Sequence, residues 1–466
     1  MFGISKNSIT HIDPEVALAL ADLPKLYRVV FVTISCGYRK HNIDRITKES
    51  NESQLDDIRG YARLVKTGIT TLDRIKVYFC GQPEAGKTTL AHALAGRLSE
   101  INLTEDVLMS RTRGIAVFNV KLANGAEYSF WDFAGQIDYH VHHDLFMFPE
   151  GAIFVVLIDL RCSDEERKKH ATYWMQYITT QCPHNVRPNV LIAATHADQA
   201  DPAMFPVFSI DVHVSLLIID LMTTFGNSVT FVTTDAILLN CTDAASDSLT
   251  RVHDEIEAVR LRFTAETPAT TPLICKQIID ALAELKAGGV RMLTWEKYCE
   301  AMRPICEDRE LLALATKHLH HIGEVYVGQT GRLGGTVIVD IPWLSHDVLG
   351  WLFCPRDMLQ VHQRLKLLRF HQLAEQGSVK ADDIPTSDLQ LDSAVTTLDI
   401  LEAFELCYGF EQDGAKHYVF PSLLRNQMPS NLWGPHAAFD AHIGLRFYCT
   451  DPVSYTHLTL PTIYSV

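Results

Sequence analysis

The sequence predicts an α/β domain followed by a second domain of the α+β class. Four apolar, β-rich segments, over 75–80, 128–133, 152–158 and 189–195, are typical of buried strands in a mostly parallel sheet. Leucines and alanines at helical spacing follow the first of them directly. After a stretch rich in Thr and Pro over 264–273, the chain mixes helical patterns with short strands, which indicates a separate domain.

The composition indicates a globular chain of more than one domain. Its 466 residues exceed the usual size of a single domain, and 47% of them are hydrophobic. The formal net charge of −15 argues against a general binder of nucleic acid or acidic lipid. The 11 cysteines sit singly, as expected of buried free thiols in a reducing compartment. No apolar run approaches the ~18 residues that a membrane-spanning helix needs, so we expect a cytoplasmic protein without a transmembrane segment.

A glycine-rich turn after the first strand matches the phosphate-binding loop G-x-x-x-x-G-K-[ST]. Gly81 and Gly86 permit backbone angles that let N–H groups point at phosphate oxygens, and the helix N-terminus adds the positive end of its dipole. Lys87 would reach the outer phosphates, and the Thr88 hydroxyl would bind Mg²⁺. A glycine turn that merely caps a helix is the alternative. The expected nucleotide-binding residues of this loop are Gly81, Gln82, Pro83, Glu84, Ala85, Gly86, Lys87, Thr88 and Thr89.

A second candidate motif, Asp-x-x-Gly-Gln, ends the next of these strands with Asp132, Gly135 and Gln136. We expect Asp132 to hold Mg²⁺ through water, and the Gly135 N–H to bond the γ-phosphate and release it on hydrolysis. Gln136 would orient the attacking water, so Gln136 and Lys87 are the catalytic candidates. An ordinary exit from a strand into a turn is the alternative.

The strand over 189–195 ends in Thr195-His196-Ala197-Asp198, which is a candidate base-reading loop. An Asp at this place accepts hydrogen bonds from the N1–H and the exocyclic amine of guanine together, a donor pair that adenine lacks. Asp198 would therefore select GTP over ATP, with Thr195 and His196 beside it. The usual motif is Asn-Lys-x-Asp, so polar loop residues without a ligand are the alternative. An ATP-driven switch is a further reading, and Asp198 argues against it.

The segment between the first two motifs holds a hairpin and a further metal-ligand candidate. A strand over 114–122 is predicted to pair with the next one through the turn Ala123-Asn124-Gly125. Thr112 would coordinate magnesium when a triphosphate is bound. Arg111 and Arg113 either touch phosphate or are surface charges. The predicted magnesium ligands are thus Thr88, Thr112 and Asp132.

Histidines cluster at two places, His140, His142 and His143, and again over 317–323. Neither group has a cysteine or a second His pair at metal-binding spacing. We interpret the first group as part of a mobile switch segment and the second as part of an amphipathic helix.

These motifs resemble those of a known family. "TRGI" (112–115), "WDFAGQ" (131–136) and "THAD" (195–198) are similar to the Roc GTPase domain, the Ras-like domain of Roco proteins. Thr-His-x-Asp in place of Asn-Lys-x-Asp is itself a mark of that family. The resemblance covers about 75–265 and implies a Ras-like P-loop GTPase that binds GTP or GDP with Mg²⁺. It assigns the site to Lys87, Thr88, Thr112, Asp132, Gly135, Gln136, Thr195, His196 and Asp198. A guanine-loop motif near 238–243 matches poorly, and nothing is assigned there.

The second domain has the pattern of a winged helix, with helices over 292–302 and 309–323 followed by a glycine-rich hairpin. It is not basic, so a protein-binding role is more natural than a nucleic-acid role. "PWLSHDVLGWLF" (342–353) and "YVFPSLL" (418–424) resemble the COR domain that follows Roc in Roco proteins. The resemblance implies dimerisation through this domain, coupled to the state of the GTPase.

The expected organisation has four parts. These are an N-terminal or linker segment over 1–70, a Roc-like GTPase domain over 71–265, a COR-like domain over 270–452 and a non-native, adapter-derived tail over 453–466.

The predicted function is GTP binding with slow hydrolysis, used as an intracellular signalling switch or scaffold that forms a homodimer or binds protein partners. A non-hydrolysing scaffold, stabilised by guanine nucleotide, is the alternative, and the retained Gln136 favours hydrolysis. No His-Arg-Asp or Asp-Phe-Gly kinase motif is present.

Overall fold

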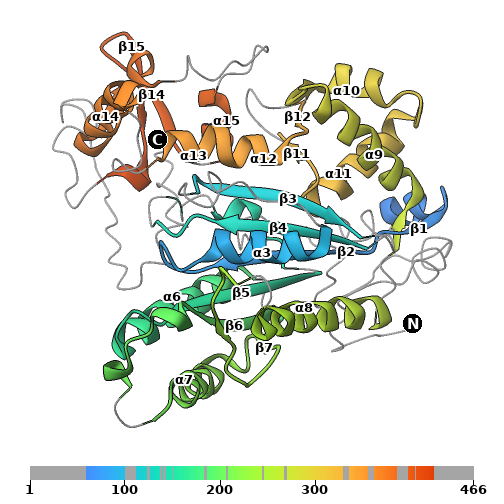
Figure 1. Cartoon of the computed structure of the whole chain (residues 1–466). Helices are drawn as coiled ribbons and strands as arrows, with labels where there is room; N and C mark the ends of the chain where they lie inside the picture. Colours follow the sequence, from blue (N-terminus) through green and yellow to red (C-terminus); the bar gives the residue numbers. More distant parts are fainter. Residues whose placement is uncertain are drawn as a thin grey trace, which may run out of the picture.

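The computed structural model describes residues 59–424 except 100–111, 123–125, 137–138, 140–142, 150, 183–185, 206–207, 244–245, 267–269, 329–334, 355–360, 386–396 and 405. The Ala123-Asn124-Gly125 turn, Arg111, His140, His142, most of the N-terminal segment and the tail over 453–466 lie outside the described residues. Figure 1 shows a large sheet with helices on both faces and a second unit of helices and small sheets packed along one side. No helix in the described part is long and apolar enough to cross a membrane.

The large sheet has seven strands in the order β3-β4-β2-β5-β6-β7, with β8 also beside β6. All neighbours are parallel except β3 and β4, which form the predicted antiparallel pair. Every residue of β4 and β6 is buried, which explains why these strands read as continuous apolar runs. The strands are β2 (Arg74–Cys80), β3 (Ile115–Lys121), β4 (Glu127–Phe133), β5 (Ala152–Asp159), β6 (Asn189–Thr195), β7 (Thr230–Phe231) and β8 (Leu238–Leu239).

The strand order has a topological switch point at the carboxyl ends of β2 and β5. These neighbours are followed by connections that run to opposite sides of the sheet, because β4 lies beyond β2 and β6 lies beyond β5. Open α/β sheets bind ligands at such a switch point. The phosphate-loop sequence follows β2 and therefore lies at this switch point.

Alternating side chains of the strands pack on two helical layers. Val77 and Phe79 belong to one apolar cluster with α3 (Lys87–Ser99) and α8 (Asp247–Glu266). Tyr78 points to the opposite face and belongs to the cluster that contains α6 (Asp164–Gln181) and α7 (Ile210–Phe225). This is the two-layer cover that a parallel sheet requires.

The second unit contains the predicted helix-helix-hairpin plan after α9, although the first residues of the helix predicted over 292–302 form β10 instead. Its first helices pack on a three-stranded sheet of order β10-β12-β11, and a second sheet has the order β13-β15-β14. The elements are α9 (Leu273–Ala287), β10 (Met292–Thr294), α10 (Trp295–Met302), α11 (Arg309–His321), β11 (Tyr326–Val327), β12 (Thr336–Ile338), α12 (Ile341–Trp343), η6 (Leu344–Leu349), α13 (Gly350–Leu352), α14 (Val361–Gln376), β13 (Ser378–Lys380), α15 (Thr397–Ala403), β14 (Tyr408–Gln412) and β15 (Ala415–Val419).

The chain just before β2 packs on this second unit. A helix over residues 59–65 buries Leu64 in the same cluster as Ile274, and β1 (Ile69–Thr71) pairs antiparallel with β9 (Thr270–Pro272). The Thr/Pro stretch, which we expected to be a domain boundary, carries a strand, and its adjacent threonines suit an extended backbone.

The second unit also covers part of the large sheet. Leu344 and Leu349 belong to the same buried cluster as Ile115 of β3 and Phe133 of β4. They lie in η6, a π-helical turn that follows α12. This contact places the second unit directly against the strands that lead into the predicted switch segments.

Replacing Leu344 by Ala should destabilise the chain. The side chain is fully buried between the sheet and the second unit, so the cavity left behind should lower the free energy of unfolding by about 2–5 kcal/mol. Urea unfolding followed by tryptophan fluorescence measures the change. Leu365, which is 78% exposed on α14, provides the matched control, and Leu365→Ala should change stability by less than about 0.5 kcal/mol. Equal effects of the two variants would contradict the packing of η6 on the sheet.

Candidate nucleotide-binding site

The predicted phosphate loop connects β2 to the N-terminus of α3. Gly86 has a φ of +83°, which glycine adopts without strain, and Glu84 has a φ of +62°. Ala85 is buried, whereas Pro83 and Glu84 are exposed. The loop thus has the strand-loop-helix setting that phosphate binding by backbone N–H groups requires.

Lys87 is the first residue of α3 and folds back onto the loop. Its Nζ donates hydrogen bonds to the carbonyl oxygens of Gly81 at 2.9 Å and Gln82 at 2.7 Å. The side chain is only 6% exposed, and burial lowers the pKa of Lys87 to about 8, although the nearby Asp132 acts in the opposite direction. An anion beside Lys87 would favour its charged form.

Thr88, Thr112 and Asp132 come together beside this lysine. Asp132 Oδ2 accepts hydrogen bonds from Thr88 Oγ1 at 2.6 Å and Thr112 Oγ1 at 2.8 Å, and the two hydroxyl oxygens are 2.8 Å apart. Burial raises the pKa of Asp132, although Lys87 and the two hydroxyls act in the opposite direction. The residues come from the start of α3, the segment before β3 and the strand β4, all at one edge of the sheet.

This cluster fits a hard cation. Within the described part of the chain, the buried Oδ1 of Asp132 has no hydrogen-bond partner, so one carboxylate oxygen has unused acceptor capacity. Hydroxyl and carboxylate oxygens are the protein ligands that Mg²⁺ takes, together with water and phosphate oxygens. Among the described residues, no group of three or more His, Cys, Asp or Glu side chains forms another metal site.

The Asp-x-x-Gly-Gln turn lies against the phosphate loop. A Cβ on Gly135 would come within 2.4 Å of the Pro83 nitrogen and 2.5 Å of the Gln82 carbonyl carbon, so only glycine fits. The side-chain Oε1 of Gln136 is buried and, within the described residues, has no hydrogen-bond partner. The two predicted motifs are therefore in direct contact, with a polar group of Gln136 available.

The Thr195-His196-x-Asp198 segment approaches the same loop from β6. Thr195 is fully buried, and its Oγ1 donates to the Ala85 carbonyl oxygen at 2.9 Å. His196 has a left-handed φ of +58°, and its imidazole lies beside Gly86. Asp198 is exposed in the turn η3 (Ala197–Gln199). The geometry gives Thr195 a structural bond to the loop and leaves Asp198 accessible.

Sequence reasoning missed three residues of this site. Asp159 ends β5 and contacts His196, and Arg161 follows it and contacts the phosphate loop. Cys241 lies beside Gly86 after β8. Burial, with the charge of Asp198 acting in the same direction, raises the pKa of Cys241 to about 12. The signal for Asp159 was its place at the carboxyl end of a strand next to β2. The signal for Cys241 was the segment over 238–243, which matched the expected motif too poorly to be assigned.

Comparison with known proteins identifies the domain that carries the site. The family model "Ras of Complex, Roc, domain of DAPkinase" matches residues 76–198. Two relatives come from Dictyostelium discoideum, and each is 24% identical to this chain. The probable serine/threonine-protein kinase pats1 matches 78% of this chain, and the cyclic GMP-binding protein C matches 76%. A Roco2 RocCORdC structure from Methanosarcina barkeri, bound to GDP, matches 77% of this chain and 98% of its own, with a TM-score of 0.51 and 17% identity. The chain is therefore similar to Roco proteins and matches their Roc domain over 76–198.

The Roc match confirms the resemblance drawn from the motifs, and the structural match confirms the predicted fold class. The match over 76–198 spans all three motifs that the sequence analysis singled out. The chain spans 11% of pats1 and 13% of the cyclic GMP-binding protein C, so it corresponds to a small part of these relatives.

Replacing Thr195 by Val should destabilise the Roc domain. The change keeps the shape of the side chain but removes the donor to Ala85, and an unpaired buried carbonyl should cost about 1–3 kcal/mol of unfolding free energy. Urea unfolding of the nucleotide-free chain measures this. Thr223→Val is the matched control, because Thr223 is exposed and bonds only within its own helix, at 2.9 Å from the Ile219 oxygen. If Thr195→Val unfolds at the wild-type urea concentration, the bond to the loop has no structural role.

Proposed function

We propose that this chain binds GTP and GDP with Mg²⁺, hydrolyses GTP slowly and acts as a nucleotide-dependent switch that dimerises through its second domain. The observation that carries the proposal is the meeting of three predicted motifs at one edge of the sheet. Asp132 accepts from Thr88 and Thr112, Gly135 touches the phosphate loop, and Thr195 bonds to it.

Each residue has a role that its environment supports. The loop N–H groups and Lys87 would bind the phosphates, and Lys87 would exchange its two carbonyl partners for phosphate oxygens. Thr88, Thr112 and Asp132 would hold Mg²⁺, which neutralises charge on the phosphates when it is bound. Gln136 would orient the attacking water, and its unpartnered Oε1 among the described residues supports this role.

Asp198 would read the base. It is exposed next to His196, which lies beside Gly86, so its carboxylate is accessible at the same edge of the sheet as the phosphate loop. Guanine presents two donors to one carboxylate, and adenine presents none in this arrangement. The relative from Methanosarcina barkeri was solved with GDP, which is consistent with guanine as the base.

Contacts of the switch segments with the second unit support a signalling role. Gly114 lies just after Thr112, and a Cβ built on it would come within 2.4 Å of the Ser345 oxygen. On the other side of this contact, a Cβ built on Gly350 would come within 3.0 Å of the Arg113 carbonyl carbon. The Tyr139 hydroxyl, three residues after Gln136, donates to the Gly350 oxygen at 3.1 Å. Both segments that would sense the γ-phosphate thus touch η6 and the start of α13, so their rearrangement would reach the second unit.

Fluorescent GDP, competed by unlabelled GTP and ATP with and without Mg²⁺, tests the binding. We expect competition by GTP and not by ATP, and faster GDP release after chelation of Mg²⁺. Asp198→Asn should weaken GDP binding by ~10-fold or more, because a charged acceptor for two donors is lost. Asp201→Asn is the control, since Asp201 lies three residues away and accepts only from the local Ala203 nitrogen, at 2.9 Å. Competition by ATP equal to that by GTP would overturn the assignment of Asp198.

Replacing Gln136 by Leu separates hydrolysis from scaffolding. Without an oriented water, single-turnover GTP hydrolysis should fall by ~100-fold or more, while the affinity for GDP stays unchanged. Phosphate release measures the rate, and Gln277→Leu, at an exposed position of α9, is the control. A wild-type chain that binds GTP without turnover, or a variant that hydrolyses at the wild-type rate, would favour the non-hydrolysing scaffold.

A further inference from the structure

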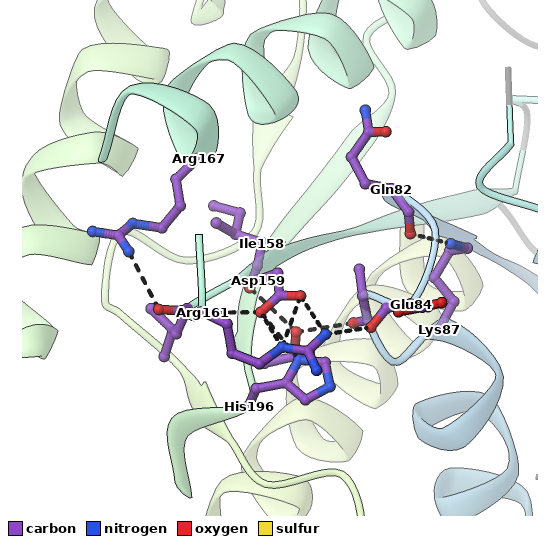
Figure 2. A network of polar contacts seen from close by, with 11 residues as sticks. Gln82, Glu84, Lys87, Ile158, Asp159, Arg161, Arg167 and His196 are labelled. Atoms are coloured by element: carbon purple, nitrogen blue, oxygen red, sulfur yellow. Dashed lines mark hydrogen bonds and ion pairs between the residues drawn. The ribbon is translucent and has the colours of Figure 1, made fainter. Parts of the chain in front are cut away.

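We propose that Asp159 and Arg161 are positioning residues of the nucleotide site: Asp159 fixes the loop that reads the base, and Arg161 fixes the phosphate loop. The inference rests on the proposed guanine-nucleotide binding and adds two residues that no motif of the sequence contains. Figure 2 shows the network, in which Asp159 lies between Arg161 and His196, and Arg161 reaches on to Glu84.

Asp159 is the last residue of β5 and the centre of the network. Arg161 Nη2 donates to Asp159 Oδ2 at 2.7 Å, and Arg161 Nε lies 3.0 Å from Oδ1 and 3.2 Å from Oδ2. The Arg161 backbone nitrogen also donates to Oδ1, at 2.9 Å. This forked arrangement fixes the guanidinium against the carboxylate more firmly than a single bond would.

Arg161 extends the network to the phosphate loop. Its Nη2 donates to the Glu84 carbonyl oxygen at 3.1 Å, across 77 positions of sequence. Glu84 holds a left-handed backbone conformation, with φ at +62°, which is unfavourable for a residue with a side chain. A hydrogen bond that fixes the carbonyl of this residue stabilises the loop in the conformation that presents its N–H groups.

His196 extends the network in the other direction, to the base-reading loop. Its Nδ1 lies 3.3 Å from Asp159 Oδ1, a contact that becomes an ion pair when the imidazole is protonated. His196 is also left-handed, with φ at +58°, and it lies two residues before Asp198. Among the described residues, three non-glycine residues have positive φ, and the network joins two of them, Glu84 and His196. Strained backbone persists where its surroundings hold it, and here one carboxylate provides that support on both sides.

The carboxylate of Asp159 is already engaged by protein partners, so its role is to position them and not to bind the nucleotide. Its side chain is 10% exposed, and both oxygens accept from Arg161. Burial acts to raise the pKa of Asp159, but the bonds from His196 and Arg161 outweigh it and lower the pKa, which keeps the group ionised at neutral pH. Asparagine has the same shape but lacks the charge. It would therefore weaken the contact with His196 and the bonds from Arg161 at once.

Loss of the Asp159–His196 contact and loss of the Arg161–Glu84 bond should affect the preference for GDP over IDP differently. Loss of Asp159 would loosen the loop that carries Asp198, which in the proposed function accepts from the exocyclic amine of guanine. IDP lacks this amine, so binding of GDP should suffer more than binding of IDP. Loss of Arg161 loosens only the phosphate loop, which GDP and IDP share. Both ligands should then weaken equally.

The experiment measures the affinities of fluorescent GDP and of competing IDP for the full chain, four single variants and one double variant. Asp159→Asn should weaken GDP binding by ~10-fold and lower the preference for GDP over IDP by several fold. Arg161→Met should weaken both ligands by a similar factor and leave the preference unchanged. His196→Gln should lower the preference as Asp159→Asn does, and adding it to Asp159→Asn should give less than the sum of the two effects. Asp220→Asn is the control, because Asp220 is 48% exposed on α7 and pairs with Lys168.

Three outcomes would overturn the inference. Wild-type affinity and preference in Asp159→Asn would show that the network does not position the loops. Equal weakening of GDP and IDP in Asp159→Asn, together with a lower melting temperature, would show a purely structural role. A wild-type chain that binds no GDP would remove the proposed function first, and this inference with it, whereas wild-type binding with unaffected variants removes the inference alone.

Discussion

The shape of the phosphate loop is the constraint on which the rest of the site depends. A loop that offers its N–H groups to an anion must place its carbonyl groups elsewhere, and buried carbonyls need donors. Here the carbonyls of Gly81 and Gln82 accept from Lys87, that of Glu84 accepts from Arg161, and that of Ala85 accepts from Thr195. Donors from α3, from the end of β5 and from the end of β6 thus converge on four consecutive or near-consecutive peptide groups. The side chains around the loop therefore stabilise its backbone, in addition to any role in binding a ligand.

The same constraint explains what the sequence could and could not predict. The elements that carry Asp132, Thr88 and Thr195 have plain apolar patterns. The convergence of these residues at one edge of the sheet therefore follows from the parallel order of the strands. Asp159 and Arg161 follow an equally plain strand, but their partners are a backbone carbonyl and a histidine in other loops. A contact with a carbonyl has no residue type to recognise, so no motif marks it.

Long-range pairing is the other limit of prediction from the sequence. The winged-helix plan of the second unit is local, since α10, α11 and the β11–β12 hairpin follow one another, and the sequence predicts it well. β1 and β9 are three residues each and lie about 200 positions apart, so neither shows a pattern of its own. Their pairing is set by the tertiary structure, through packing of the preceding helix and of α9 in one apolar cluster.

The pairing of β1 with β9 has a topological consequence. The chain enters the Roc domain after β1 and leaves it before β9, so both crossings between the units lie at one point, fastened by a two-stranded ribbon. The Roc domain is in effect a loop inserted into the second unit. Away from the ribbon, Gly114 and Tyr139 contact η6 and Gly350. The ribbon fixes where the chain enters and leaves the Roc domain, so the contact with η6 and Gly350 can change while the separation of these two chain ends stays constant.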